Sequence, residues 1–165
     1  MSENDFSELA RLAEHVGERL AASQQVLATA ESCTGGWIAK CITDVAGSSA
    51  WFDRGFVTYA NSAKVDMVGV SAEDLLAHGA VSEVIVLQMA QGALVNSQAD
   101  LAVAVSGVAG PGGGSATKPV GTVCLVWATK RARSQVETCH FEGDRESVRA
   151  QTVARALQGL LQQLD

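Results

Sequence analysis

Apolar residues are arranged in two kinds of pattern along the chain. The mostly apolar run at 25–30 is typical of a short buried strand, and the continuous apolar run at 101–105 is typical of a strand buried on both faces of a sheet. Apolar residues at three- and four-residue spacing predict amphipathic helices between the strands. The predicted helices cover 6–20, 37–42, 61–67, 71–78, 82–94 and 144–164, and the predicted strands cover 25–30, 51–59, 101–105, 120–129 and 135–141.

The order of these elements predicts the fold. Helices and strands are interspersed along the chain, with helices for both faces of a sheet, so we expect a three-layer α/β/α sandwich with a mixed, mostly parallel sheet of about five strands. The last two strands, separated by 130–134, predict an antiparallel hairpin that makes the sheet mixed. The length of 165 residues favours a single domain, spanning 1–165, because two domains would each have too small a core.

A polar segment joins the first strand to the next helix and contains Ser32, Cys33, Thr34, Gly35 and Gly36. Ligands of open α/β sheets bind where strands end, and the amides of a helix N-terminus favour an anion. We therefore expect this segment to bind substrate, around either a phosphate or a developing oxyanion. Ser32 is the first candidate nucleophile, although a role as helix cap would also explain Ser32 or Thr34.

The candidate base for Ser32 is a lysine, because none of the three histidines is placed where a Ser-His-Asp triad would be obvious. Lys64 follows the second strand, and parallel strands would bring it to the same sheet edge as Ser32. A Ser–Lys pair is a known nucleophile–base arrangement if burial or a nearby cation lowers the lysine pKa. Tyr59, the single tyrosine, could hydrogen-bond either residue or stack on a flat ring. An exposed lysine and a packing tyrosine are the structural alternatives.

A second glycine-rich segment follows the buried run at 101–105. Glycine backbone at the end of a strand can cradle phosphate or ribose, and Arg145 at the start of the last helix could pair with the phosphate. A flexible loop and a surface arginine are the alternatives, since the segment matches neither common nucleotide-binding motif. The residues of this segment that we expect to contact substrate are Ser106, Gly107, Gly110, Gly112 and Gly113.

Composition and charge narrow the class of function. The net charge of −6, from 12 basic and 18 acidic residues, argues against a nucleic-acid partner. No apolar stretch approaches the roughly 20 residues of a membrane span, and the N-terminus lacks a basic signal-peptide region. We therefore expect a cytoplasmic protein with no membrane partner. Four cysteines without a Cys-x-x-Cys motif predict free thiols and no metal site, and the sequence leaves a homo-oligomer open.

Six short motifs occur in a fixed order along the chain. They are 30–36, 55–64, 78–82, 106–111, 118–123 and 141–145. Together these motifs strongly resemble the stand-alone nicotinamide-nucleotide amidase (PncC) family, which is equivalent to the C-terminal domain of the competence/damage-inducible protein CinA. The resemblance covers about residues 8–162. The domain that precedes this unit in two-domain CinA proteins lies outside it, so we do not expect the pyrophosphatase activity attributed to that domain.

The resemblance implies a reaction and a set of catalytic residues. Members of the family deamidate nicotinamide mononucleotide to nicotinic acid mononucleotide and ammonia in pyridine-nucleotide recycling. The resemblance therefore implies a Ser/Lys amidohydrolase that needs no metal or other cofactor. The serine, lysine and tyrosine of the family match Ser32, Lys64 and Tyr59 of this chain.

Within this hypothesis, the amides of 33–36 form an oxyanion hole, and the segment 106–114 with Arg145 holds ribose and phosphate. Two rival interpretations stay open. Cys33, the only cysteine in the junction, would make the protein a thiol amidase if it were the nucleophile. In the other interpretation, the chain is a non-catalytic nucleotide-binding or protein-interaction module.

Overall fold

The computed structural model describes residues 3–164, with side chains from residue 6 onward. These residues form six helices, five strands and one short 3₁₀ turn (η1, Ser48–Ala50). The helices are α1 (Glu3–Ser23), α2 (Trp37–Thr43), α3 (Asn61–Val68), α4 (Ala72–His78), α5 (Glu83–Val95) and α6 (Arg145–Leu164). The strands are β1 (Leu27–Glu31), β2 (Phe52–Val57), β3 (Leu101–Gly107), β4 (Thr122–Thr129) and β5 (Gln135–His140).

The five strands form one mixed sheet in the order β2-β1-β3-β4-β5. β1 pairs in parallel with β2 and β3, whereas β4 pairs antiparallel with β3 and β5. Among these five strands, β4 therefore runs against the other four. The predicted α/β sandwich with a mostly parallel, mixed sheet and a terminal hairpin is confirmed.

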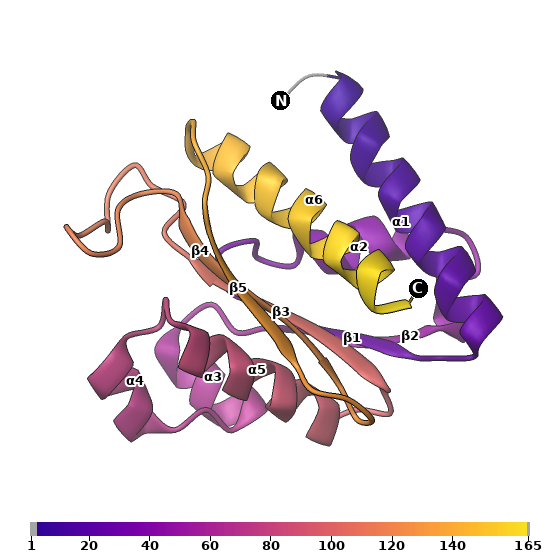
Figure 1. Cartoon of the computed structure of the whole chain (residues 1–165), viewed down its shortest axis with the longest axis horizontal. Coiled ribbons are helices and arrows are strands. Elements are labelled where there is room, and N and C mark those ends of the chain that lie inside the picture. The colour runs from indigo at the N-terminus through magenta and orange to yellow at the C-terminus, as the bar shows by residue number, and fades with distance from the viewer. Residues whose placement is uncertain (1–2, 165) are drawn as a thin grey trace.

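Helices cover both faces of the sheet and enclose two separate cores (Figure 1). α1, α2 and α6 lie on one face, called the α6 face here, over a core that includes Leu27 and Val103. α3, α4 and α5 lie on the other face, the α5 face, over a core that includes Ala28 and Ala104. Because successive residues of a strand point to opposite faces, β1 and β3 supply side chains to both cores.

The position of α3 depends on a close backbone contact with α5. A Cβ atom at Gly92 of α5 would lie 1.8 Å from the backbone oxygen of Val68, the last residue of α3. A residue with a side chain would push the two helices apart, so glycine permits this approach. α3 is thereby held against the α5 face, and its Lys64 side chain is 1% exposed.

Strand β2 is shorter than the sequence pattern predicts, because it ends at Val57 rather than at residue 59. The amide of Thr58 still donates to the carbonyl of Glu31, and the chain then turns into α3. This turn directs the carbonyl groups of Thr58 and Tyr59 toward a side chain of α3 instead of into the sheet. The shortening therefore supplies two acceptors at the carboxyl end of the sheet.

Candidate active site

Ser32 and Lys64 meet at the carboxyl ends of β1 and β2. Ser32 directly follows β1, and the alternation of Ala28 and Ala30 before it places its side chain on the α5 face. Lys64 reaches it from α3, with Nζ 3.1 Å from the Ser32 Oγ, and both side chains are buried. The structure therefore brings together the two residues predicted as nucleophile and base.

The Lys64 amine is surrounded by backbone carbonyls. Its Nζ donates to the carbonyl of Thr58 at 2.9 Å and to that of Tyr59 at 3.3 Å, and no carboxylate of the described residues forms an ion pair with it. Burial lowers the pKa of Lys64 from its ordinary value of 10.5. In the neutral amine, two N–H groups suffice for the two carbonyls, which leaves the lone pair for the Ser32 hydroxyl. A general base needs this geometry.

Glu31, the last residue of β1, organises the segment that follows it. Its side chain is 1% exposed and lies on the α6 face. The carboxylate accepts hydrogen bonds from the Thr34 hydroxyl at 2.7 Å and from the amides of Gly36, Ile38 and Ala39 at 3.2, 3.0 and 2.8 Å. The N-terminus of α2 therefore already has an anion from within the chain, which satisfies its amide donors and its dipole.

This internal anion changes which amides can stabilise an oxyanion. The sequence analysis expected the amides of 33–36, but those of Gly35 and Gly36 already donate hydrogen bonds within the chain. The amides of Cys33 and Thr34 donate to no carbonyl or carboxylate of the described residues. In this segment, the amides of Cys33 and Thr34 are therefore the ones left available to an oxyanion, and an amide directly after a nucleophile is a common oxyanion donor.

Cys33 is a poor candidate for the nucleophile. Its side chain belongs to the core of the α6 face, whereas the Ser32 side chain lies on the α5 face. Burial raises the pKa of the Cys33 thiol to about 12. Such a thiol is protonated at neutral pH, and the thiolate is the nucleophilic form. The geometry therefore disfavours the thiol-amidase interpretation.

Tyr59 and Arg145 contact each other. The Tyr59 side chain is 58% exposed, and its hydroxyl accepts a hydrogen bond from Arg145 Nη2 at 2.9 Å. The sequence analysis left open a hydrogen bond from this hydroxyl to Ser32 or Lys64, but Tyr59 contacts Lys64 through its backbone carbonyl instead. Arg145 Nη1 also donates to the carbonyl of Gly110 at 2.8 Å. Arg145 therefore links Tyr59 to the second glycine-rich segment.

The second glycine-rich segment has a packed part and an exposed part. A Cβ atom at Gly107 or Gly110 would lie 2.6 Å from a valine side chain of β4 or of the residues just before it. These two glycines therefore let the chain pack against β4, while Gly112 and Gly113 are exposed. Ser106 lies deeper, near the end of β3, and its side chain is buried.

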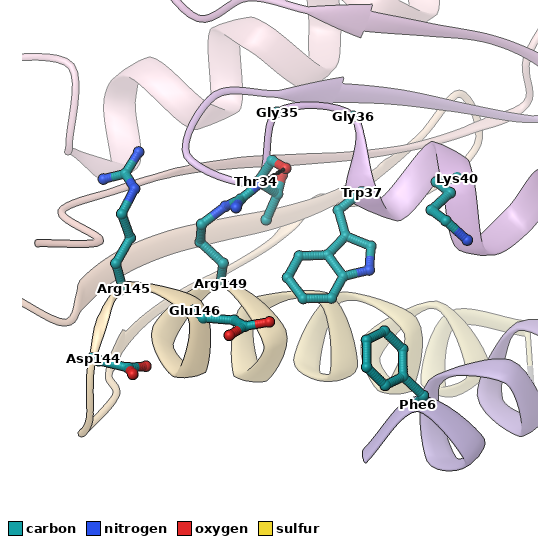
Figure 2. Close-up of a pocket in the computed structure, with 10 residues that line it drawn as sticks. All are labelled: Phe6, Thr34, Gly35, Gly36, Trp37, Lys40, Asp144, Arg145, Glu146 and Arg149. Carbon is teal, nitrogen blue, oxygen red and sulfur yellow. Dashed lines mark hydrogen bonds between the residues drawn. The ribbon is translucent and has the colours of Figure 1, made fainter. Parts of the chain in front are cut away.

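A cavity of about 730 Å³ opens on the α6 face beside the start of α2 (Figure 2). Residues 34–36 and Arg145 line it, whereas Ser32 and Lys64 do not. The backbone turn after β1 therefore borders both the cavity and the Ser–Lys pair. The cavity opens on the opposite face of the sheet from that pair. The remaining lining residues are Phe6, Trp37, Lys40, Asp144, Glu146 and Arg149.

Arg149 is a residue of this region that the sequence analysis missed. Its Nε and Nη2 donate to the carbonyls of Cys33 and Thr34 at 3.0 and 2.8 Å, and its guanidinium lies over the Trp37 ring, 5.4 Å from the centroid. In Figure 2 the Arg149 side chain extends from α6 toward Thr34. N–H and C=O of a trans peptide point in opposite directions. Holding the Cys33 carbonyl on the α6 face therefore turns the Thr34 N–H away from that face.

Two weak signals in the sequence point to Arg149 and Glu31, the residues that the sequence analysis missed. Arg149 follows Arg145 by four positions, a spacing that places both side chains on the same side of a helix. Glu31 is a charged residue directly after an apolar run, and a buried carboxylate needs partners. Neither signal says which atoms the side chain contacts.

Some features expected of other protein classes are missing from the described part of the chain. Among residues 3–164, no three His, Cys, Asp or Glu side chains are grouped so that they could hold a metal ion. No helix in the same range combines the length and apolar character needed to cross a membrane. The four cysteines are free thiols, as predicted.

Comparison with known proteins places the chain in a family. The sequence model of the CinA C-terminal domain matches residues 9–164. The chain is 58% identical over 157 residues to the nicotinamide-nucleotide amidohydrolase PncC of Escherichia coli K12, covering 95% of each chain. It is 53% identical over 163 residues to the protein of the same name from Enterobacter agglomerans, covering 99% of this chain and 98% of the relative.

Solved structures show the same fold. The competence/damage inducible protein CihA from Agrobacterium tumefaciens is 47% identical, with a TM-score of 0.92 and coverage of 94% of each chain. The competence damage-inducible protein A (ComA) from Klebsiella pneumoniae is 41% identical, with a TM-score of 0.91 and coverage of 94% of this chain and 96% of that chain. With its match to the family model and these similarities along nearly its whole length, the chain belongs to the CinA C-terminal domain family.

Proposed function

We propose that this protein is a nicotinamide-nucleotide amidohydrolase, with Ser32 as the nucleophile and Lys64 as the base. Its reaction converts nicotinamide mononucleotide to nicotinic acid mononucleotide and ammonia, as a step of pyridine-nucleotide recycling. The observation that carries the proposal is the 3.1 Å contact between the Ser32 hydroxyl and the buried Lys64 amine. The names of the similar bacterial proteins support the substrate class.

The reaction begins with Lys64 as a neutral amine. Lys64 accepts the proton of Ser32 while the Ser32 Oγ forms a bond to the carboxamide carbon. The negative charge that develops on the carboxamide oxygen is stabilised by the amides of Cys33 and Thr34. The C–N bond then breaks, Lys64 gives its proton to the nitrogen, and ammonia leaves. Water, deprotonated by Lys64, finally hydrolyses the Ser32 ester and restores the serine.

The carbonyls of Thr58 and Tyr59 fit both protonation states of Lys64. They accept the two N–H groups of the neutral amine, whose lone pair then faces Ser32. When Lys64 gains the serine proton, the third N–H points toward the Ser32 Oγ, and so toward the group that this oxygen has attacked. The amine therefore needs no reorientation between the two proton transfers.

Arg145 and the segment 106–113 hold the ribose and phosphate in this proposal. Arg145 has five N–H donors, and two hydrogen bonds, to Gly110 and Tyr59, fix its position beside the glycine-rich segment. The exposed ring of Tyr59 provides a surface on which the nicotinamide ring stacks. These two residues orient the nucleotide while its carboxamide reaches Ser32.

The test is ammonia release from nicotinamide mononucleotide, nicotinamide riboside and free nicotinamide. Ser32→Ala is expected to lower kcat by roughly 10⁴-fold or more, because it removes the nucleophile. Ser23→Ala, at the end of α1 and far from the site, is the matched control and should keep full activity. Near-normal ammonia release by folded Ser32→Ala protein would refute the assignment. Activity on free nicotinamide alone would refute the phosphate contact.

The two rival interpretations predict other results. A thiol amidase would be inactivated by iodoacetamide, whereas we expect no loss of activity, because the Cys33 thiol is buried and protonated. A non-catalytic module would bind nicotinamide mononucleotide without releasing ammonia. Binding by calorimetry, measured beside the ammonia assay, distinguishes this case.

A further inference from the structure

Ser106 has the one buried hydroxyl of the described residues that forms no hydrogen bond. Its side chain is 1% exposed, and its Oγ contacts no donor or acceptor of the protein. In the described part of the chain, no side-chain nitrogen or oxygen that is closed off from solvent lacks a partner, so the Ser106 Oγ is accessible to solvent. The other buried hydroxyls all have partners: Thr29, Ser32, Thr34, Thr58, Ser97, Thr122 and Thr152.

Ser106 lies beside the nucleophile. The amide of Ser32 donates to the carbonyl of Val105 at 3.0 Å, so Ser106 is the neighbour of Ser32 across β1 and β3. Adjacent strands are about 4.8 Å apart. Ala104, two residues earlier in β3, packs on the α5 face, so the Ser106 hydroxyl shares that face with Ser32. Lys64 approaches Ser32 from the β2 side and Ser106 flanks it on the β3 side.

The proposed reaction needs a hydrogen-bond acceptor at this position. A primary carboxamide has one oxygen, which faces the amides of Cys33 and Thr34, and an NH₂ group with two donors. The lone pair of neutral Lys64 is engaged with the Ser32 hydroxyl and is not available to the substrate. On entering the site, an N–H of the carboxamide loses its hydrogen bond to water. This loss costs free energy unless an acceptor of the protein takes the place of the water.

We propose that the Ser106 Oγ accepts a hydrogen bond from the carboxamide N–H and thereby orients the leaving nitrogen toward Lys64. Ser106 forms no covalent bond and transfers no proton in this role. The inference rests on the proposed function and deepens it, because it assigns Ser106 to the reacting amide rather than to ribose or phosphate. It also makes Ser106 a determinant of selectivity for primary carboxamides.

The test compares two substrates that differ at one group: nicotinamide mononucleotide and the methyl ester of nicotinic acid mononucleotide, which has no N–H. Ser106→Ala is expected to lower kcat/KM for the amide by about 10- to 100-fold and that for the ester by less than about threefold. Ser106→Thr keeps a hydroxyl and should recover most of the amide activity. Cys124→Ala, at the position paired with Ser106 in β4, is the packing control and should hydrolyse both substrates like the wild type.

The outcomes separate this inference from the function on which it rests. Equal losses on amide and ester by Ser106→Ala would overturn it, because a general structural role affects both substrates. Wild-type amide hydrolysis by Ser106→Ala, with Ser32→Ala inactive, would also overturn it and leave the proposed function standing. Wild-type protein that releases no ammonia would refute the proposed function, and the inference with it.

Discussion

The turn at residues 31–36 serves the two faces of the sheet in different ways. On the α5 face, Ser32 meets a buried lysine whose other partners are backbone carbonyls. On the α6 face, the backbone of 34–36 lines an open cavity, where Arg149 and Lys40 already bind groups of the protein. The cavity is the more conspicuous feature, yet the groups suited to nucleophilic chemistry lie on the other face.

Lys40 on the α6 face and Lys64 on the α5 face differ in exposure and in pKa. Lys40 is exposed on α2, and its hydrogen bond to Asp44 raises its pKa. Lys64 is buried under the turn, and burial lowers its pKa. The same side chain is thus a permanent cation on one face and a candidate base on the other. Solvent and neighbours, rather than residue type, decide which role a lysine can take.

Among the changes that compare the two faces, the largest expected effect comes from replacing Lys64 by arginine, with the same replacement of Lys40 as its control. Lys64→Arg should lower kcat by about 10³-fold or more, because a guanidinium keeps the charge but cannot act as a base at neutral pH. Lys40→Arg should change kcat by less than about twofold, because it keeps the charge, the exposure and the Asp44 partner. Ammonia release at saturating nicotinamide mononucleotide measures both. Similar losses of kcat in the two variants would show that Lys64 has no catalytic role that Lys40 lacks.

A smaller effect is expected from Glu31, whose carboxylate holds the turn for both faces. Glu31→Ala leaves the buried Thr34 hydroxyl and the first amides of α2 without an acceptor, so the free energy of unfolding should fall by about 3 kcal/mol. Urea unfolding monitored by circular dichroism measures this change. Asp44→Ala removes an exposed carboxylate from the end of the same helix and should cost less than about 1 kcal/mol. If the free energy of unfolding fell by less than about 1 kcal/mol in Glu31→Ala as well, the Glu31 carboxylate would not be needed to stabilise the turn.

The smallest effect is the contribution of Lys64 to the pH dependence of stability. Burial lowers the pKa of Lys64 in the folded protein below the ordinary 10.5 that applies to the unfolded chain. Between these two pKa values the unfolded chain binds more protons, so the free energy of unfolding rises with pH. Below both values the contribution is constant. The difference in unfolding free energy between wild type and Lys64→Met, measured in urea at successive pH values, should therefore increase toward pH 10.5. A flat difference would place Lys64 in a solvent-like environment.

Most of the fold could be predicted from the sequence because the buried strands are so apolar. β3 contains the continuous apolar run at 101–105. The short connection between β4 and β5 predicts their hairpin. The end of β2 could not be predicted, because Thr58 and Tyr59 have strand-like propensities. Their departure from the sheet depends on the tertiary position of α3, which the local pattern does not contain.

The candidate site was predictable where it depends on strand ends and not where it depends on distant contacts. Ser32 and Lys64 both follow parallel strands, so topology alone brings them near each other. Arg149 contacts Cys33 across 116 positions of sequence, and no local pattern indicates such a contact. The contact between the Tyr59 hydroxyl and Arg145 was not predicted for the same reason, because Arg145 comes from the start of α6.

The acceptors that hold the Lys64 amine have a consequence for how the site tolerates sequence drift. Both are main-chain oxygens, of residues 58 and 59, so replacing either side chain leaves the acceptor in place. Related proteins could therefore vary at these two positions without losing the orientation of the amine. Insertions, deletions or a proline that rerouted the chain between β2 and α3 would have the opposite effect. The length and course of this connection, more than its composition, should limit which variants of the protein keep the Lys64 amine in this orientation.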